Sequence, residues 1–337
     1  MVPTPRRVSV LVSTYNRPEY LRLALRSILA QSYDDFDVLV WNDGGSEMEG
    51  IVPELDDPRV RYHHHPENLG VMQAVAEGVR ATHGEYIAHM DDDDEWDPGF
   101  LAAQVRLLDE NPTASIAFCD HWIIDEDGTI DARSTEHNSR HWGRLELRAG
   151  LHEPAYEITL SGTIPMASAA VIRRSDLDID DVPAAMYFAW DLWVAYLATH
   201  NGRGVVFNPG RLSRKRRHAQ QMGSAVASIR NLTDLVLAYE RMWGEPSFDV
   251  DRDALAGRLS AASANWSIAL LREGDYDGAA AAARRSIEVR RSARGYAAVA
   301  VSSLPPQLSR LVALASSNAL ARWRRVSQAS HVGHGAH

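Results

Sequence analysis

The sequence predicts an α/β fold, with a mainly parallel sheet flanked by helices and an all-helical region at the C-terminal end. Strand-like runs rich in β-branched residues alternate with helix-length amphipathic segments through the first 120 residues, a pattern typical of βαβ units. Beyond about residue 224 the chain becomes rich in Ala and Arg with helical periodicity. At 337 residues and 45% apolar composition, the chain is long enough for one large domain and a smaller addition.

The elements of the first region follow from periodicity and from turn residues. Pro18 stands at a favoured first-turn position of a helix, and Asn111-Pro112 is a stop signal for another. Predicted strands span 7–13, 37–42, 60–63 and 85–90, with further candidates at 115–122 and 167–173, and predicted helices span 18–31, 69–82, 98–110 and 191–200.

The predicted domain organisation divides the chain near residue 224. Residues 1–224 are expected to form the α/β domain and residues 225–326 a helical region, with helices at 226–243, 254–273 and 276–291. Within it, Asn265 to Tyr276 and the Ala-rich helix that follows resemble one tetratricopeptide-like hairpin. Such repeats need about three copies to bury a continuous core, so an ordinary helical hairpin is favoured. Residues 327–337 are expected to be a disordered tail.

The segment 307–325 has the pattern of a basic amphipathic helix. Its apolar face carries Leu308, Leu311 and Val312, and Arg310 and Arg322 stand at the polar edge. A helix of this kind can lie on an anionic membrane surface. Docking of the helix on its own protein is the more common arrangement and is favoured here.

Composition limits the class of protein. No apolar run has membrane-spanning length, and the N-terminus leads directly into a strand without a signal-peptide region, so a cytoplasmic location is expected. Cys119 is the only cysteine, which excludes an intrachain disulfide. The net charge is −10, but residues 1–202 carry 15 basic and 35 acidic side chains whereas 203–337 carry 20 and 10. The acidic first part argues against nucleic-acid binding, which requires clustered Lys and Arg.

Four consecutive carboxylates, Asp91 to Asp94, follow directly after an apolar strand. Adjacent negative charges repel one another, so such a run is tolerated at a strand end mainly when a cation neutralises it or when it is fully solvated. The end of a strand faces the crevice where open α/β sheets bind ligands, and this position favours a cation site. An EF-hand loop is excluded, because its sixth position must be Gly and that position here is Trp96.

Two further polar turns end the first and second strands, at 13–17 and 42–46. Because the carboxyl ends of parallel strands meet at one edge, these turns are expected to lie beside the acidic run. Asp43 can accept the imide N–H of a uracil ring, and Thr14 can hold the base edge or the ribose. Taken alone, the sequence Asn-Asp-Gly-Gly favours a simple turn.

Together, these segments resemble the family 2 glycosyltransferases, which are inverting nucleotide-sugar enzymes of the GT-A fold. The resemblance rests on four segments in the family's order, Val8–Arg17, Trp41–Ser46, Glu67–Gly70 and Gly84–Pro98, and it covers roughly residues 1–220. It implies a nucleotide-binding half at about 1–120 and an acceptor-binding half at about 121–224. The residues that it implies for nucleotide binding are Thr14, Tyr15, Asn16, Arg17, Asp43, Asn68, Asp91 and Asp92.

In that family an Asp-x-Asp motif at the end of the fourth strand binds the metal, and this motif matches Asp91 to Asp93. The resemblance implies that Asp93 binds Mn²⁺ or Mg²⁺ directly, while Asp91 or Asp92 holds the ribose or a metal-bound water. Asp94 is an alternative ligand, because a shift by one residue still satisfies the pattern. The segment 212–224 resembles the family's Tyr-Arg-x-His loop, which implies His218 as a metal ligand. The basic residues before His218 could neutralise the departing diphosphate, and a solvated basic turn is the alternative for Lys215 and Arg216.

The reaction also needs a general base, which takes the proton of the attacking acceptor hydroxyl. The family places an acidic residue about a hundred residues after the metal motif, at the start of a helix, and Asp191 matches it. Asp191 is the only carboxylate between Asp181 and Asp234 and lies among aromatic residues. Its alternative role is that of a helix N-cap. Trp190 replaces the Glu that usually precedes the base.

The resemblance implies metal-dependent, inverting transfer of a hexose-type sugar from a nucleotide sugar. The expected donor is a UDP-sugar, and the expected acceptor is a hydroxyl of a glycan, a lipid-linked oligosaccharide or a natural product. Two alternatives remain open. A sugar-phosphate nucleotidyltransferase would need a Gly-rich first turn, which 13–17 lacks. A catalytically silent scaffold would act through its C-terminal helices.

Overall fold

A computed structural model of the chain describes residues 6–187, 189–219 and 229–315. It divides the chain into two compact units, one of Met1–Ser224 with Glu245–Asp251 and one of Ala225–Gly244 with Arg252–His337. The short segment Glu245–Asp251 lies in the first unit because Phe248 packs against Tyr156 and Tyr196, with ring centroids 4.9 and 5.9 Å apart. The sequence places this segment in the helical region instead.

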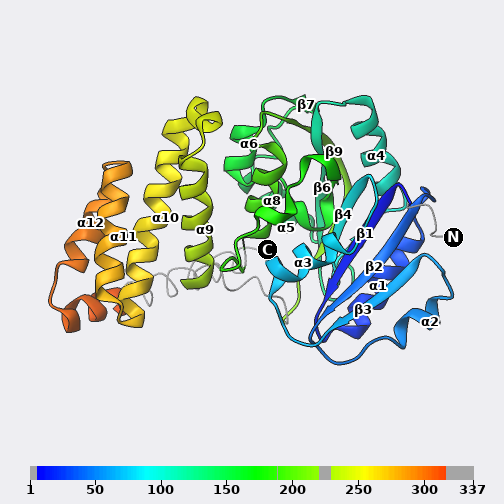
Figure 1. The fold of residues 1–337 in the computed structure, drawn as a ribbon, viewed down its shortest axis with the longest axis horizontal. Coiled ribbons are helices and arrows are strands. Elements are labelled where there is room, and N and C mark those ends of the chain that lie inside the picture. The colour runs from blue at the N-terminus through cyan, green and yellow to red at the C-terminus, as the bar shows by residue number, and fades with distance from the viewer. Residues whose placement is uncertain (1–5, 188, 220–228, 316–337) are drawn as a thin grey trace, which may run out of the picture. The chain divides into compact units, whose positions relative to one another are not determined.

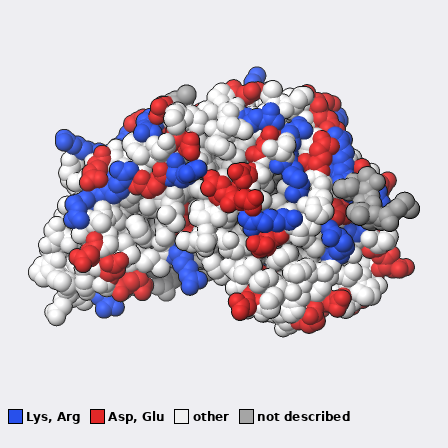
Figure 2. Space-filling view, viewed as in Figure 1, with Lys and Arg blue, Asp and Glu red and all other residues white. Residues whose placement is uncertain are grey.

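Figure 2 shows acidic and basic side chains interspersed on the face drawn.

The first unit is built on one sheet with the strand order β3-β2-β1-β4-β8-β6-β9-β5, and β7 pairs with β9. The strands are β1 (Val8–Thr14), β2 (Phe36–Asp43), β3 (Val60–His65), β4 (Tyr86–Asp91), β5 (Glu95–Trp96), β6 (Ala114–Ile124), β7 (Gly150–His152), β8 (Ala170–Arg173) and β9 (Gly204–Arg216). The helices are α1 (Pro18–Leu29), α2 (Ile51–Leu55), α3 (Val71–Arg80), α4 (Phe100–Glu110), α5 (Ala132–His141), α6 (Tyr156–Ser161), the short turn α7 (Met166–Ala169) and α8 (Trp190–Thr199). Figure 1 shows helices flanking this sheet.

Alternation along β1 explains how the helices cover the sheet. Successive side chains of a strand point to opposite faces, and Val8, Val10 and Val12 join the core formed with α1 and α4. Leu11 points to the other face, where it meets α3 at Gly78. An ideal Cβ on Gly78 would lie 2.5 Å from Leu11, so only glycine allows this close packing of helix on strand.

The sheet is mainly parallel, as predicted, and among the described strands only the short β5, β7 and β8 run antiparallel to their neighbours. β1 is parallel to β2 and β4, and β2 to β3, as predicted. β8 then runs antiparallel to both β4 and β6. The predicted strand at 167–173 begins only at Ala170, because Ser168 has φ 63° and interrupts the extended backbone. The sequence did not predict β9, whose 13 residues pair with β6, β5 and β7.

The second unit is helical, as predicted, with α9 (Ile229–Trp243), α10 (Arg252–Glu273), α11 (Tyr276–Val289) and α12 (Ala293–Ser302). α12 was not predicted. Of the predicted helix at 307–325, residues 307–315 are helical, and the rest lies outside the described residues, as does the predicted tail at 327–337. Within the described part, Leu308 and Leu311 are exposed, whereas Ser309 and Ala313 are buried.

Candidate active site

Three strand ends meet at one edge of the sheet, as the sequence predicts. The register pairs Ser13 at the end of β1 with Trp41 of β2 on one side and with Asp91 of β4 on the other. The turns after β1 and β2 are joined directly, because Asn16 Oδ1 accepts a hydrogen bond from the Ser46 backbone N–H at 2.6 Å. This edge is therefore a shared polar surface built from separate segments of sequence.

The carboxylates of Asp91, Asp93 and Asp94 form a cluster at this edge, with one oxygen of each within 4.8 Å of the others. Asp93 and Asp94 are buried, and Asp94 Oδ2 has no hydrogen-bond partner among the described residues. A buried carboxylate oxygen without a partner is costly unless a ligand satisfies it. Three carboxylates are the hard oxygen ligands that Mg²⁺ and Mn²⁺ prefer, so these residues fit a divalent cation.

One cationic side chain and one histidine lie against the cluster. Arg17 and His218 both contact Asp93 Oδ2, the imidazole Nε2 at 2.8 Å. The His218 side chain is 1% exposed and packs against Tyr20, with ring centroids 4.6 Å apart. In this conformation His218 contacts a carboxylate of the cluster rather than joining it, and direct metal ligation by His218 stays a prediction.

Asp92 is not part of the group formed by the other three carboxylates. Its Oδ2 accepts a hydrogen bond from Thr14 Oγ1 at 2.6 Å, and its Oδ1 lies 2.8 Å from Arg17 Nη2. Asp92 is 0% exposed, so in this conformation it supports the end of β1 and orients Arg17. A contact of Asp92 with a nucleotide stays a prediction.

Burial changes the protonation of this region. Desolvation raises the pKa of Asp92 to about 7, against the opposing effect of Arg17. Desolvation also raises the pKa of Asp94, although Lys215 opposes it. Burial opposes protonation of Arg17, but the nearby Asp92 and Asp93 outweigh it and raise the pKa of the guanidinium. The cluster therefore carries more negative charge than its surroundings favour, which is the condition under which a cation binds.

Asp191 is the second residue of α8, and its carboxylate is held by the turn that precedes β8. Asp191 Oδ1 accepts a hydrogen bond from the Ala167 backbone N–H at 3.1 Å. The residue is exposed to solvent, yet desolvation raises its pKa, with Lys215 acting in the opposite direction. An accessible carboxylate with surrounding protein close enough to raise its pKa is suited to general-base work.

Lys215, near the end of β9, is a residue for which the sequence left both a role beside the diphosphate and a solvated turn open. Although burial opposes it, the carboxylates of Asp94, Asp91, Asp191 and Asp93, in decreasing order, raise the pKa of its ammonium group. Lys215 thus supplies positive charge near both the acidic cluster and Asp191, the candidate base. Its neighbour Arg216 is 1% exposed, and its backbone N–H donates to Asp94 Oδ1 at 2.9 Å. The alternative of a solvated basic turn is wrong for both residues.

The predicted nucleotide-base region is ordered by Asp43. Its two carboxylate oxygens accept hydrogen bonds from the backbone N–H groups of Leu69 and Gly70, at 2.9 and 3.0 Å. Asp43 is 5% exposed, and desolvation raises its pKa. The carboxylate therefore fixes the loop that carries Asn68, and a contact with a nucleobase stays a prediction. Tyr15 and Asn68 are exposed near these turns.

The same loop is packed against the segment that leads to Asp191. Gly70 has φ 82°, and an ideal Cβ there would lie 2.0 Å from the ring of Tyr187. The Tyr187 carbonyl accepts a hydrogen bond from the Met72 N–H at 3.2 Å. A side chain at position 70 would displace this aromatic ring. Phe188, and residues 220–224 of the predicted histidine loop, lie outside the described residues.

The fold and this site together define the class of protein, and comparison with known proteins identifies the family. The family model described as glycosyl transferase family 2 matches residues 9–178. The chain belongs to this family and is a glycosyltransferase. The sequence resemblance is thereby confirmed at the level of family and class.

Sequence relatives share part or most of the chain. A putative colanic acid biosynthesis glycosyl transferase of Escherichia coli, WcaA, is 33% identical over 108 residues, which are 30% of this chain and 39% of that protein. The match thus spans less than half of that relative. The uncharacterized protein Rv1520 of Mycobacterium tuberculosis is 27% identical over 271 residues, or 75% of this chain and 73% of that protein.

Solved structures confirm the GT-A fold. Staphylococcus aureus TarS 1–349 in complex with UDP-GlcNAc superposes with a TM-score of 0.63 at 16% identity, covering 88% of this chain and 90% of that one. The mannosyltransferase PcManGT of Pyrobaculum calidifontis, in complex with GDP-Man and Mn²⁺, gives a TM-score of 0.56 at 19% identity, covering 94% of this chain and 88% of that one.

In the described part of our chain, every helix is too short or too polar to cross a bilayer.

Proposed function

We propose that this protein is a metal-dependent, inverting glycosyltransferase that moves a sugar from a UDP-sugar to an acceptor hydroxyl. The observation that carries the proposal is the turn at Ala167–Ser168, which contacts both the acidic cluster and Asp191. Ser168 Oγ accepts from the Asp91 N–H at 3.0 Å, and the Ala167 N–H donates to Asp191. The same turn therefore holds a cation site and a candidate base, and the proposed transfer requires both.

Asp91, Asp93 and Asp94 would hold the divalent cation, Mn²⁺ or Mg²⁺, whose bound charge would offset that of the donor diphosphate. Arg17 and Lys215 add fixed positive charge beside this cluster. Charge that is already in place where the leaving group becomes more negative stabilises the transition state without reorganisation. Both TarS and PcManGT are solved with nucleotide sugars, which supports a donor of this class here.

In the proposed transfer, the acceptor oxygen forms a bond to the anomeric carbon while the bond from that carbon to the diphosphate oxygen breaks. The electron pair of the broken bond leaves with the diphosphate, and Asp191 takes the hydroxyl proton. A carboxylate with a raised pKa is a better base than an ordinary aspartate, provided that it is ionised at the working pH. Lys215 favours the ionised form of Asp191.

The acceptor is proposed to be a hydroxyl of a glycan, a lipid-linked oligosaccharide or a small molecule. A cytoplasmic location and membrane contact through residues 307–325 stay predictions from the sequence. The exposed Leu308 and Leu311 are the described side chains that such a contact would use.

A donor screen by thermal unfolding tests the proposal. The full chain is heated with UDP-GlcNAc, UDP-glucose, UDP-galactose and GDP-mannose, each with Mn²⁺ and with EDTA. Ligands that bind the native state raise the unfolding temperature. We expect stabilisation by a UDP-sugar only with Mn²⁺, and slow metal-dependent release of UDP from that donor. Equal stabilisation in EDTA would contradict metal dependence, and stabilisation by GDP-mannose alone would contradict the UDP assignment.

A further inference from the structure

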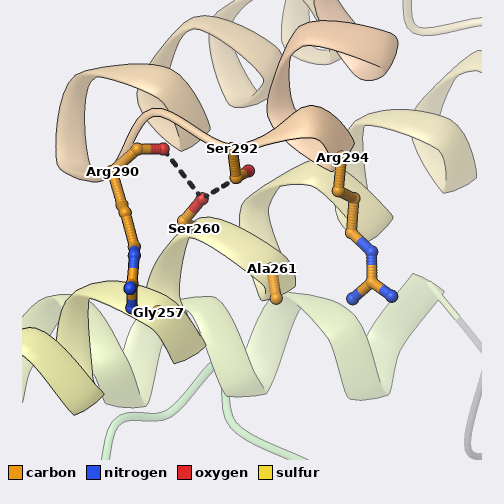
Figure 3. Close-up of a pocket in the computed structure, with 6 residues that line it drawn as sticks. All are labelled: Gly257, Ser260, Ala261, Arg290, Ser292 and Arg294. Atoms are coloured by element: carbon orange, nitrogen blue, oxygen red, sulfur yellow. Dashed lines mark hydrogen bonds between the residues drawn. The ribbon is translucent and has the colours of Figure 1, made fainter.

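The helical unit contains a cavity of about 360 Å³ between α10 and the segment that connects α11 to α12. It is lined by Gly257, Ser260, Ala261, Arg290, Ser292 and Arg294. Figure 3 shows the two arginine side chains extending toward α10 on either side of Ser260 and Ala261. These residues are separate from those of the proposed transfer site, so the cavity needs an explanation of its own.

The lining carries two guanidinium groups and no carboxylate. Arg290 is paired with Asp253, with Nη2 3.5 Å from Oδ2, and the two side chains are 45% and 88% exposed. An exposed ion pair of this kind contributes little, so an anion in the cavity can compete for Arg290. Arg294 is exposed and has neither a hydrogen bond nor an ion pair with any residue that the structure describes. The cavity therefore has uncompensated positive charge.

The walls around this charge are held in place. Ser260 is buried, and its Oγ lies 3.2 Å from the Arg290 carbonyl oxygen and 3.4 Å from Ser292 Oγ. Ser292 also caps α12, because its Oγ accepts from the Gly295 N–H at 3.0 Å. Gly257 makes room for Arg290, since an ideal Cβ there would lie 2.8 Å from Nη1. The cavity is thus fixed at one wall by a buried serine and at the other by a capped helix.

We propose that this cavity binds the phosphate group of a phosphorylated ligand. Guanidinium groups bind phosphate oxygens through paired, charge-assisted hydrogen bonds. The first turn of α12 also presents its N-terminal dipole there. The volume lies at the lower end of small-molecule sites, which suits a phosphate with a small attached group. A carboxylate would use this charge less fully, because it has fewer oxygens.

Arginine side-chain NMR on the full chain tests the site without any substitution. The protein, labelled with ¹⁵N-arginine and kept in EDTA, is titrated with inorganic phosphate at constant ionic strength, with chloride as the control anion. We expect the Nε–H signals of Arg290 and Arg294 to shift saturably with phosphate. Arg291 is the internal control, because it lies exposed in the same segment without lining the cavity. Equal shifts of Arg291 and Arg294, or shifts that do not saturate, would overturn the proposal.

A matched pair of variants then measures the contribution of the two arginines. Arg290→Lys with Arg294→Lys keeps the charge but removes the forked donors, so phosphate affinity should fall about tenfold. Arg291→Lys should bind as the wild type does. Far-UV circular dichroism and the unfolding temperature establish that both variants fold. A folded double variant with wild-type phosphate affinity would overturn the proposal.

Two further arms identify the source of the phosphate. Glycerol 3-phosphate serves as a soluble ester, and vesicles of phosphatidylcholine with 20% phosphatidylglycerol serve as a lipid surface, with pure phosphatidylcholine as control. Saturable shifts with the soluble ester support a soluble ligand. If the wild type and Arg291→Lys sediment with the anionic vesicles and the double variant does not, the ligand is a lipid headgroup. Failure of both probes, with inorganic phosphate also inactive, contradicts the site.

Discussion

Ser168 Oγ accepts a hydrogen bond from the backbone N–H of Asp91 at 3.0 Å. The residue before it, Ala167, donates its own N–H to Asp191. Ser168 has φ 63°, a conformation that is uncommon for a residue with a side chain and that clusters at functional sites. One strained turn thus fixes both the end of β4 and the start of α8. The proposed base and the proposed cation ligands are positioned by the same few residues.

The substitution Asp191→Asn should leave donor and cation binding intact, because the role of Asp191 exists only during transfer. Transfer should fall by roughly two orders of magnitude or more, the usual contribution of a general base. Because desolvation by the surrounding protein raises the pKa of Asp191, the wild-type rate should rise with pH through a value above that of an ordinary aspartate, and the variant should lose this acidic limb. Steady-state kinetics from pH 4 to 9 measure both effects.

Asp180 supplies the matched control for Asp191. It is an exposed carboxylate in the preceding loop and pairs with Arg80 at 2.9 Å. Asp180→Asn should therefore transfer sugar at the wild-type rate. Near wild-type transfer by Asp191→Asn together with a large loss in Asp180→Asn would move the base to Asp180.

The substitution Asp93→Asn should abolish metal-dependent binding of UDP while the fold survives. It removes one charge from the cluster but keeps an amide that can still meet Arg17 and His218. Calorimetric titration of UDP with Mn²⁺ measures the loss. Asp97→Asn is the control, because Asp97 pairs with Arg214 at 2.7 Å and stands outside the cluster. Unchanged UDP affinity in Asp93→Asn would exclude Asp93 as a ligand.

The sequence predicted the parallel strands β1 to β4 well, because Val8, Val10 and Val12 alternate regularly and polar turns follow each strand. It failed where the chain depends on distant partners. β9 carries Asn208, Pro209 and Gly210 within a single strand, and its register against β6 shifts around Asp120. Local pattern cannot predict such a strand, because its pairing with β6, β7 and β5 determines it.

The acidic cluster and Asp191 were found from sequence because each has a motif and a position relative to a strand or helix. The sequence left the role of Lys215 open, because four basic residues in a row are also typical of a solvated turn. Its proximity to Asp91 and Asp191 depends on β9 returning beside β6 and β5, which are far away in sequence. The role of Asp92 was likewise hidden, since only the folded chain shows that Thr14 and Arg17 enclose it.

The substitution Lys215→Met should change two affinities in opposite directions. Removal of a cation from the cluster should tighten Mn²⁺ binding, whereas UDP binding in EDTA should weaken about tenfold, because a charge-assisted contact contributes about 1.5 kcal/mol or more. Calorimetry with Mn²⁺ alone and with UDP alone separates the two. Arg217→Met, in the exposed neighbour of the same basic run, should alter neither. Weaker Mn²⁺ binding in Lys215→Met would contradict the position of Lys215 beside the cluster.

The substitution Asp43→Ala should raise the donor KM much more than it lowers kcat, because a base contact is the same in ground and transition states. Asp43 also holds the N–H groups of Leu69 and Gly70, so a loss of loop order must be separated from a loss of base recognition. Affinities for UDP and ADP make this separation. If Asp43 recognises uracil, the preference for UDP disappears, whereas loop disorder weakens both nucleotides equally.

Stability in EDTA should fall as the pH rises, because burial raises the pKa of two carboxylates of the acidic run and so favours their protonated form in the folded state. An unfolded aspartate titrates near about 4, whereas burial raises the pKa of Asp92 to about 7 and also raises that of Asp94. Between these values the folded state binds more protons than the unfolded chain, so the free energy of unfolding decreases with pH through this window.

A divalent cation should reverse this loss, since it competes with the same protons. We expect Mn²⁺ to raise the unfolding temperature more at pH 8.5 than at pH 5, and the unfolding temperature in EDTA to decline between pH 4 and 8. Asp94→Asn removes one titrating group from the cluster, so its unfolding temperature in EDTA should depend less on pH and its response to Mn²⁺ should be smaller. Scanning calorimetry across this range measures both. A wild-type response to Mn²⁺ that is equal at the two pH values would contradict competition between the cation and protons at Asp94.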